Sequence, residues 1–266
     1  MSAIRQWFRR NLPAILVFVV FLGTWEVVIS NLDVRAFILP APSSIANALV
    51  ENWEAGYQIW PAAQNTFFEA AGGMVIGTVF GIVVALMISR WRLAGDIALP
   101  VAVALSAIPI IAFAPIANNW FGVLSPTSKM VIAAVLVFFP IMINVLRGLT
   151  DVPPSSLELM RSYAAGSWAV FRKVRMPNAL PYFLTGLKVG ITLALIGAVV
   201  GEYFGGLTVA LGRIVVSSAS TLAFEITWAA IIVASVVGMA MYLVIVAIER
   251  VAIPWHPEVR GNREQS

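Results

Sequence analysis

The sequence predicts an all-α membrane protein with about six transmembrane helices. Apolar residues make up 60% of the 266 residues and charged residues only 11%, and ordinary soluble domains are far less apolar. The mean hydropathy is +0.91. The apolar residues are gathered into runs of roughly 18 to 25, the length with which a helix crosses a hydrocarbon core of about 30 Å. A soluble fold could not bury this much apolar surface.

The apolar runs divide the chain into six expected spans. They cover residues 12–30, 67–89, 97–117, 129–147, 180–204 and 226–248. Pro109 and Pro115 interrupt the third run. Helix breaks persist within a membrane only where protein or a water-filled cavity satisfies the freed backbone groups. We therefore expect the third span to face a pore.

The first span has an alternative interpretation. Arg9 and Arg10, followed by an apolar stretch, also resemble the start of a secretory signal peptide. No small-x-small cleavage site follows this stretch, which runs instead into Trp25 and Glu26. Because that pattern is typical of an interfacial helix end, we expect the span to be retained.

The distribution of Lys and Arg predicts the orientation, because positive residues in short loops are retained on the cytoplasmic side. With the N-terminus inside, 13 of the 17 Lys and Arg residues lie in cytoplasmic segments, whereas Arg35, Lys129 and Arg213 lie in outer ones. Both termini are thus expected in the cytoplasm. The expected segments are a cytoplasmic N-terminus (1–11), a membrane domain (12–250) with an outer segment (31–66) and a cytoplasmic loop (148–179), and a cytoplasmic tail (251–266).

The residues that the sequence lacks exclude several function classes. There is no cysteine and only a lone histidine, His256, so neither thiol chemistry nor a metal site is expected. No lysine follows a glycine, so no G-x-x-x-x-G-K-[ST] phosphate loop exists and ATP must be handled by another chain. The basic residues follow membrane topology and form no patch with stacking aromatics, so no nucleic-acid partner is expected. An intramembrane enzyme is disfavoured because no H-E-x-x-H motif or convincing nucleophile and base pair is present.

Glycines separated by three residues recur in the second and fifth spans. They are Gly73, Gly77, Gly81, Gly186, Gly190, Gly197 and Gly201. Small faces of this kind let helix backbones approach closely in lipid, where packing drives association. We expect them to pack helices into one bundle, in preference to the alternative of direct ligand contact.

Charged residues inside spans face a cavity, a partner or the interface. Lys188 lies about two turns into the fifth span from the cytoplasmic side, and we expect its side chain to extend to the interface. Glu69 lies close enough to the end of the second span to be interfacial as well.

The cytoplasmic loop has the pattern of a helix that meets a partner. Two prolines, two serines and Glu158 form a helix start over residues 153–158. An apolar stripe follows at Leu159, Met160, Tyr163, Ala164 and Trp168. A loop that faced bare cytosol would have no reason to keep this stripe, so we expect a partner surface to cover it. The alternative is an amphipathic helix attracted to anionic lipid on the membrane surface.

This loop resembles the signature of permease subunits of ABC importers, which reads Glu-Ala-Ala, three residues, Gly, nine residues, Ile-x-Leu-Pro. Glu158 takes the acidic position, Leu159 and Met160 stand at the alanines, Ala164 stands at the glycine, and residues 174–177 match the close. The spacing matches throughout, whereas several identities are substituted. The flanking residues and the outer segment Ile-Leu-Pro-Ala-Pro-Ser, which begins at residue 38, resemble the nitrate, taurine and aliphatic-sulfonate branch.

The resemblance implies a type I ABC importer permease (MetI-like) architecture in the cell membrane of a prokaryote. It implies a coupling helix that binds a cytoplasmic ABC ATPase dimer, with ATP and Mg²⁺ on the ATPase and no cofactor on this chain. An external substrate-binding protein and a second permease copy, forming a homodimer, are further implied partners besides the lipid membrane. The residues implied in coupling are Glu158, Leu159, Met160, Arg161, Ser162, Tyr163, Ala164, Ala165, Gly166, Val174 and Pro177.

The outer halves of the later spans suggest a substrate path. The candidate lining residues are Phe113, Asn118, Glu202, Tyr203 and Phe204. An acid beside aromatic rings favours a neutral or weakly cationic heterocycle, and the tail over residues 253–257 resembles importers of pyrimidine-type or flavin-type vitamin precursors. The alternative substrates are nitrate, sulfonate, taurine and bicarbonate, and the alternative role of Glu202 is to stabilise the helix end. An ATP-independent secondary transporter is a remote alternative, since we find no clear internal repeat.

Overall fold

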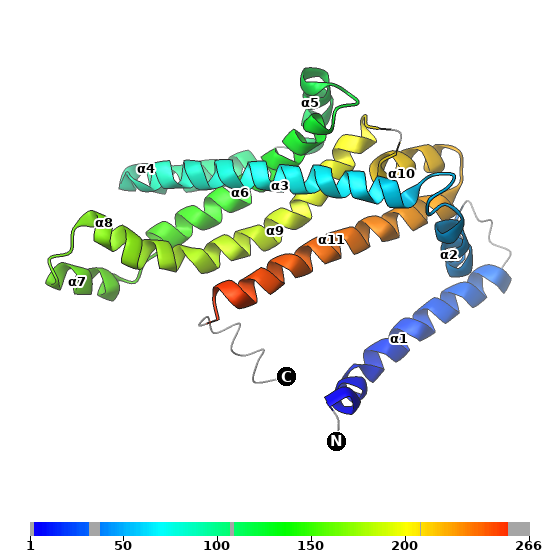
Figure 1. Ribbon diagram of the computed structural model, residues 1–266, viewed down its shortest axis with the longest axis horizontal. Helices are drawn as coiled ribbons and strands as arrows, with labels where there is room; N and C mark the ends of the chain where they lie inside the picture. Colours follow the sequence, from blue (N-terminus) through cyan, green and yellow to red (C-terminus); the bar gives the residue numbers. More distant parts are fainter. Residues whose placement is uncertain (1–2, 32–37, 107–108, 208, 255–266) are drawn as a thin grey trace.

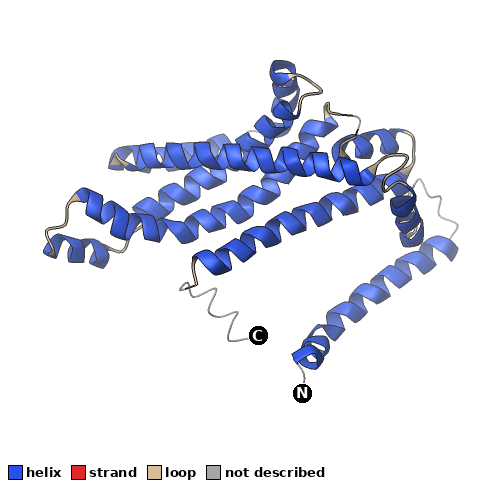
Figure 2. Ribbon diagram, viewed as in Figure 1, coloured by secondary structure: helices blue, strands red, loops and turns tan. Residues whose placement is uncertain are grey.

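The computed structural model describes residues 3–31, 38–106, 109–207 and 209–254, and every regular element in these ranges is a helix (Figure 2). In chain order the elements are α1 Ala3–Asn31, α2 Pro42–Glu51, α3 Ile59–Ser89, α4 Arg92–Ser106, the 3₁₀ helix η1 Ile110–Phe113, α5 Ala114–Phe121, α6 Pro126–Thr150, α7 Pro154–Ser162, α8 Ser167–Val170, the π-helix η2 Phe171–Arg175, α9 Met176–Tyr203, α10 Leu211–Ser220 and α11 Phe224–Ala252. The all-α class that the sequence predicts is confirmed.

Five helical segments within the described ranges are long and apolar enough to cross a membrane. They are Leu12–Asn31, Ile59–Ser89, Pro126–Thr150, Ser167–Tyr203 and Phe224–Ala252. They correspond to the first, second, fourth, fifth and sixth spans expected from the sequence. The length of the apolar runs thus located these five helices correctly. A membrane helix must satisfy all its backbone groups within its own segment, so each span appears in the sequence as one predominantly apolar run.

The third expected span is not one helix. α4 ends at Ser106, and its apolar part, Ile97–Ser106, is shorter than the five segments that can cross a membrane. The chain then forms η1 and turns into α5 at Ala114. Proline has no N–H to donate, and its ring disfavours helical backbone in the residue before it. Pro109 and Pro115 lie where these effects would divide the segment, which agrees with the interruption expected there.

The fifth span begins earlier than the sequence suggests. α8, η2 and α9 follow one another directly, so the second half of the expected cytoplasmic loop belongs to one helical segment from Ser167 to Tyr203. Pro177 lacks the N–H that would bond to the carbonyl of Lys173. The wider π turn over Phe171–Arg175 lies where that ladder of hydrogen bonds is interrupted.

α6 is the central helix, with α3 and α9 packed along it (Figure 1). All seven glycines singled out in the sequence bring a backbone close to another helix, and six of them are close to α6 backbone or the first carbons of its side chains. Gly77 of α3 lies at Ala134 and Val137, and a Cβ added to Gly197 of α9 would lie 2.6 Å from the Cα of Ala133. These contacts leave no room for a side chain, so small residues determine how closely the three helices pack.

The bundle has two different ends. Figure 1 shows α7 and α8 at one end, together with the end of α3 and the start of α4, and shows α2 and α10 at the other. α1 contacts the rest mainly through α2 and through Trp25, whose ring lies 5.9 Å from that of Trp228 on α11. Most described side chains of α1 are exposed in a single copy of the chain. α1 therefore presents an apolar surface to lipid or to another membrane helix.

The glycine packing predicts that a glycine-to-alanine substitution destabilises the protein on α9 but not on α1. Gly197→Ala is expected to lower the free energy of unfolding by about 1–3 kcal/mol, because the new Cβ overlaps the α6 backbone. Gly23→Ala on α1 is the matched control, since a Cβ there meets no atom within 4 Å and alanine is the better helix former. Thermal unfolding in detergent measures both, and equal melting temperatures would contradict the tight packing of α9 on α6.

Candidate functional site

The surface of the α7–α8 loop, residues 151–175, carries large apolar side chains that the chain itself leaves uncovered. Leu159 on α7 is 57% exposed, Tyr163 after it is 74% exposed, and Trp168 on α8 is 71% exposed. Trp168 stacks on Phe171 with ring centroids 5.5 Å apart. No residue of α7 is buried. An exposed apolar patch on a projecting loop is the kind of surface that a protein partner covers.

The base of this loop is fixed by contacts between α6 and α9. The side-chain amide of Asn178 donates hydrogen bonds to the carbonyls of Gly148, at 2.8 Å, and Asp151, at 3.1 Å. The hydroxyl of Tyr182 donates to the Asp151 carboxylate at 3.2 Å. A Cβ on Gly148 would lie 2.6 Å from the Cα of Ala179, so the two helices touch where the loop leaves them. A force on the loop is therefore passed to both helices.

α7 has defined ends. Pro154 occupies its first turn, where a missing N–H matters least. At its other end the N–H of Ala165 bonds to the Met160 carbonyl at 3.0 Å, and the N–H of Ala164 bonds to the Arg161 carbonyl at 2.9 Å. This pair of bonds is a Schellman cap, which places one residue in the left-handed region. That residue is Ala164, with φ +49°.

The left-handed residue explains the glycine of the importer signature at this position. An L-residue with a Cβ is strained by roughly 1–2 kcal/mol in the left-handed conformation, whereas glycine adopts it freely. Ala164 keeps the conformation although it bears the Cβ. A backbone conformation that favours glycine is thus present in this chain at the position where the signature has glycine.

The remaining coupling residues expected from the sequence lie on the same loop, except Pro177, which lies at the start of α9. Glu158, Arg161, Ser162, Gly166 and Pro177 are exposed. Met160, Ala165 and Val174 are half-buried. The Ser162 hydroxyl donates to the Leu159 carbonyl at 2.8 Å, a bond inside α7. The loop thus offers its acidic, basic and apolar side chains together on one projecting element.

At the opposite end, the carboxylate of Glu202 caps a helix instead of facing a path. The side chain is fully buried, with 0% exposure. Its Oε1 accepts a hydrogen bond from the Thr66 hydroxyl at 2.6 Å, and its Oε2 accepts one from the N–H of Gly212 at 2.7 Å. The N–H of Leu211 in turn donates to Thr66 Oγ1 at 3.1 Å. The first turn of α10 therefore receives its caps from α3 and α9.

This arrangement follows from the needs of α10. Its own N-cap residue, Ala210, has no side-chain acceptor, although the first N–H groups of a helix require partners. A carboxylate at a helix N-terminus is also favoured by the helix dipole. Glu202 therefore stabilises a helix end, but the helix is α10 and not the fifth span that carries Glu202, as the alternative supposed.

The expected substrate-path residues do not converge on one surface. Asn118 is buried like Glu202, whereas Tyr203 and Phe204 are exposed and pack edge to face, 5.5 Å apart. Phe113 is half-buried and packs against Trp120. Neither polar atom of the Asn118 side chain has a hydrogen-bond partner among the described residues.

Two charged groups join Glu202 in the interior. Glu69 of α3 is only 2% exposed, and Lys129 of α6 is fully buried with its ammonium group donating to the Val123 carbonyl. The three charges are close enough to interact. Glu69 was expected at the interface; the structure buries it within the bundle, about three turns from the start of α3 at Ile59.

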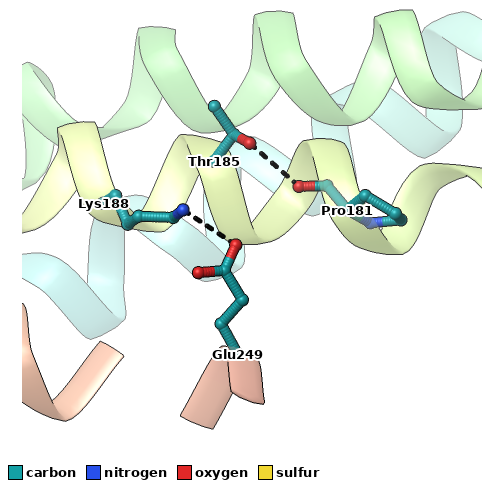
Figure 3. Close-up of polar contacts among 4 residues, drawn as sticks. All are labelled: Pro181, Thr185, Lys188 and Glu249. Carbon is teal, nitrogen blue, oxygen red and sulfur yellow. Dashed lines mark hydrogen bonds and ion pairs between the residues drawn. The ribbon is translucent and has the colours of Figure 1, made fainter. Parts of the chain in front are cut away.

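Lys188 also has a partner that the sequence did not reveal. Figure 3 shows its ammonium group directed at Glu249 of α11, and the Nζ to Oε1 distance is 2.8 Å. Both side chains are mostly buried. The expectation that Lys188 extends alone to the interface is corrected: a lysine on α9 and a glutamate on α11 neutralise each other.

Sequence analysis missed Thr66, Gly212 and Glu249. Thr66 and Glu202 are 136 positions apart, so no local pattern joins them. A Cβ on Gly212 would lie 2.5 Å from the Val199 carbonyl, which makes glycine necessary there, but the surrounding sequence has several other glycines. Among the described residues, no group of three His, Cys, Asp or Glu side chains is placed to hold a metal ion.

The chain is similar in sequence to known membrane permeases. Residues 77–253 match the family described as "Binding-protein-dependent transport system inner membrane component". A probable ABC transporter permease of Haemophilus influenzae is 30% identical over 88% of this chain and 93% of the relative. A riboflavin transport system permease of Chloroflexus aurantiacus is 28% identical, over 94% of this chain and 91% of the relative. A formylaminopyrimidine transport permease of Halalkalibacterium halodurans is 30% identical, over 90% of this chain and 94% of the relative. Permeases named for taurine, aliphatic sulfonates and nitrate match at 24–26% identity.

The strained cap of α7 yields a prediction. Ala164→Gly is expected to stabilise the loop by about 1 kcal/mol, because glycine enters the left-handed region without strain. Amide hydrogen exchange of residues 159–165 should then slow by about fivefold. Ala164→Val should speed it, since a β-branched residue is strained further at positive φ. Unchanged exchange in both variants would mean that the loop does not hold the capped conformation.

Proposed function

The chain belongs to the family of binding-protein-dependent transport system inner membrane components and is a permease subunit of an ABC importer; we propose that its α7–α8 loop receives the work of ATP hydrolysis from a separate ATPase. The observation that carries this proposal is the exposed apolar side of that loop on a fixed base. The exposed side chains of Leu159, Tyr163 and Trp168 would be buried in a cleft of the partner protein. Because the hydrogen bonds of Asn178 tie the loop to α6 and α9, a displacement of the loop by the partner would move both helices.

The proposed assembly follows the family resemblance. A cytoplasmic ATPase dimer would bind the loops of two permease copies, and an external binding protein would deliver substrate at the end that carries α2 and α10. This places both termini in the cytoplasm, as the distribution of Lys and Arg indicates. The described chain presents α1 with its apolar side chains exposed, which supports contact with lipid and with a second copy.

We further propose that the substrate is a neutral or weakly cationic heterocycle, such as a flavin or a pyrimidine precursor of a vitamin. An anionic substrate is bound best by cationic side chains or helix N-termini along its path. Lys129 and Lys188 already have partners: the ammonium group of Lys129 donates to the Val123 carbonyl, and that of Lys188 pairs with the Glu249 carboxylate. The names of the riboflavin and formylaminopyrimidine permeases, at 28% and 30% identity, support the same class.

The second candidate class is a small oxyanion such as taurine, a sulfonate, nitrate or bicarbonate. The taurine and sulfonate permeases among the relatives favour it, at 25–26% identity. Backbone N–H groups and helix N-termini bind anions without a cationic side chain. Direct measurement of uptake must decide between the two classes.

The coupling proposal predicts loss of ATPase function when the loop is altered. Deleting residues 159–165 or replacing Glu158 is expected to abolish permease-stimulated ATP hydrolysis while the membrane helices still fold. Leu159→Ser alone should weaken binding of the ATPase by roughly tenfold or more, because burying a leucine contributes about 1.5–3 kcal/mol. Co-purification in mild detergent and phosphate release measure the two effects.

Val50→Ser provides the matched control for Leu159→Ser. Val50 lies on α2 at the opposite end and is 76% exposed, so its replacement removes a similar apolar surface without touching the loop. It should leave ATPase binding unchanged. Normal transport by the deletion variant would refute the coupling role of the loop and would favour a membrane-surface helix.

The substrate proposal predicts the result of an uptake experiment. Cells that express the complete importer are expected to accumulate radiolabelled riboflavin or formylaminopyrimidine and to ignore taurine and nitrate. The deletion of residues 159–165 is the control, because it should remove every uptake that depends on this permease. Uptake of taurine or nitrate with no uptake of heterocycles would reverse the assignment.

A further inference from the structure

One continuous helical segment joins the two ends of the molecule. It begins at Ser167, inside the α7–α8 loop, and ends at Tyr203. A helix of this length extends over about 55 Å. Its first turns carry the exposed Trp168 and the contacts that fix the loop, and its last turn carries Glu202. A helix that is continuous over this distance transmits displacement from one end to the other.

The far end of this segment holds α10 by the three residues Thr66, Glu202 and Gly212, which we call the capping latch. The carboxylate of Glu202 bonds both to Thr66 and to the N–H of Gly212. Thr66 also accepts from the N–H of Leu211. Thr66 and Glu202 are fully buried, so water does not compete for these bonds.

The shape of the contact also prevents α10 from moving independently of α9. A Cβ on Gly212 would lie 2.5 Å from the Val199 carbonyl and 2.9 Å from the Cβ of Glu202. The start of α10 therefore rests on the α9 backbone itself. The rest of α10 has a separate attachment, because the Ser218 and Thr227 hydroxyls form a hydrogen bond of 2.7 Å that joins it to α11.

From this geometry we infer that the capping latch makes α10 follow the movement of α9, so that the outer end of the permease responds to the state of the ATPase. Glu202 and Thr66 are positioning residues: they act through α10 and need not touch the substrate. The inference rests on the proposed coupling function of the α7–α8 loop.

The test uses the full chain in lipid nanodiscs with the ATPase that co-purifies with it. Hydrogen exchange of residues 211–220 is compared between the nucleotide-free complex and the complex trapped with MgATP and vanadate. In the wild-type protein the exchange rate of α10 is expected to differ at least threefold between the two states. Thr66→Val keeps the side-chain shape but removes the hydroxyl, and this difference should disappear. Thr66→Ser retains the hydroxyl and should restore the difference.

Two further variants separate coupling from simple loss of structure. Ser218→Ala removes the bond between α10 and α11 but leaves the latch intact, so the wild-type difference should remain. Glu202→Gln preserves the volume of the side chain and serves if Thr66→Val does not fold; it should reduce the difference because one carboxylate acceptor is lost. A wild-type response in Thr66→Val or Glu202→Gln, or loss of the response in Ser218→Ala, would overturn the inference.

ATP hydrolysis by the same samples distinguishes failure of this inference from failure of the proposed function. If the wild-type complex hydrolyses ATP and α10 exchanges at one rate in both states, only the latch inference is overturned. If no ATPase binds to the wild-type chain, or binding survives deletion of residues 159–165, the coupling function is overturned and the inference with it.

Discussion

The close approach of three helix backbones is the contact on which the rest of the structure depends. Lipid is as apolar as a leucine side chain, so burial of apolar groups does not drive helices together within a membrane. Van der Waals contact must do so, and it is greatest where no side chain separates the backbones. The glycines of α3 and α9 provide such contact along α6. The positions of the loops at both ends follow, because α6 and α9 carry the α7–α8 loop while α3 and α9 hold α10.

Much of this fold could be predicted because its signals are local. Runs of apolar residues located five spans, and two prolines indicated where the third would divide. The α7–α8 loop was recognisable from its helix start and its apolar stripe. The pairing of Glu202 with Thr66, and of Lys188 with Glu249, could not be predicted because each depends on which faces of distant helices meet. A charged residue in a span indicates that a partner exists, but a single sequence does not identify the partner.

The loop combines a strained tip with a fixed base, and the two features suit a coupling element. Ala164 holds a conformation that favours glycine, so the end of α7 is less stable than its hydrogen bonds alone would make it. Asn178 and Tyr182 hold the other end of the loop to α6. Adjustment on binding a partner is therefore concentrated near Ala164, whereas displacement of the whole loop reaches the membrane helices.

The pair of Lys188 and Glu249 also bears on how the protein is made. α11 is synthesised after α9, and it brings the carboxylate of Glu249 into the membrane near the C-terminal end of the helix. An isolated carboxylate is poorly tolerated in a bilayer. Its ammonium partner on α9 has been synthesised 61 residues earlier, so the nascent chain already contains the counter-ion when Glu249 arrives. Insertion of α11 is thereby tied to correct placement of α9, which supplies the positive charge that neutralises Glu249.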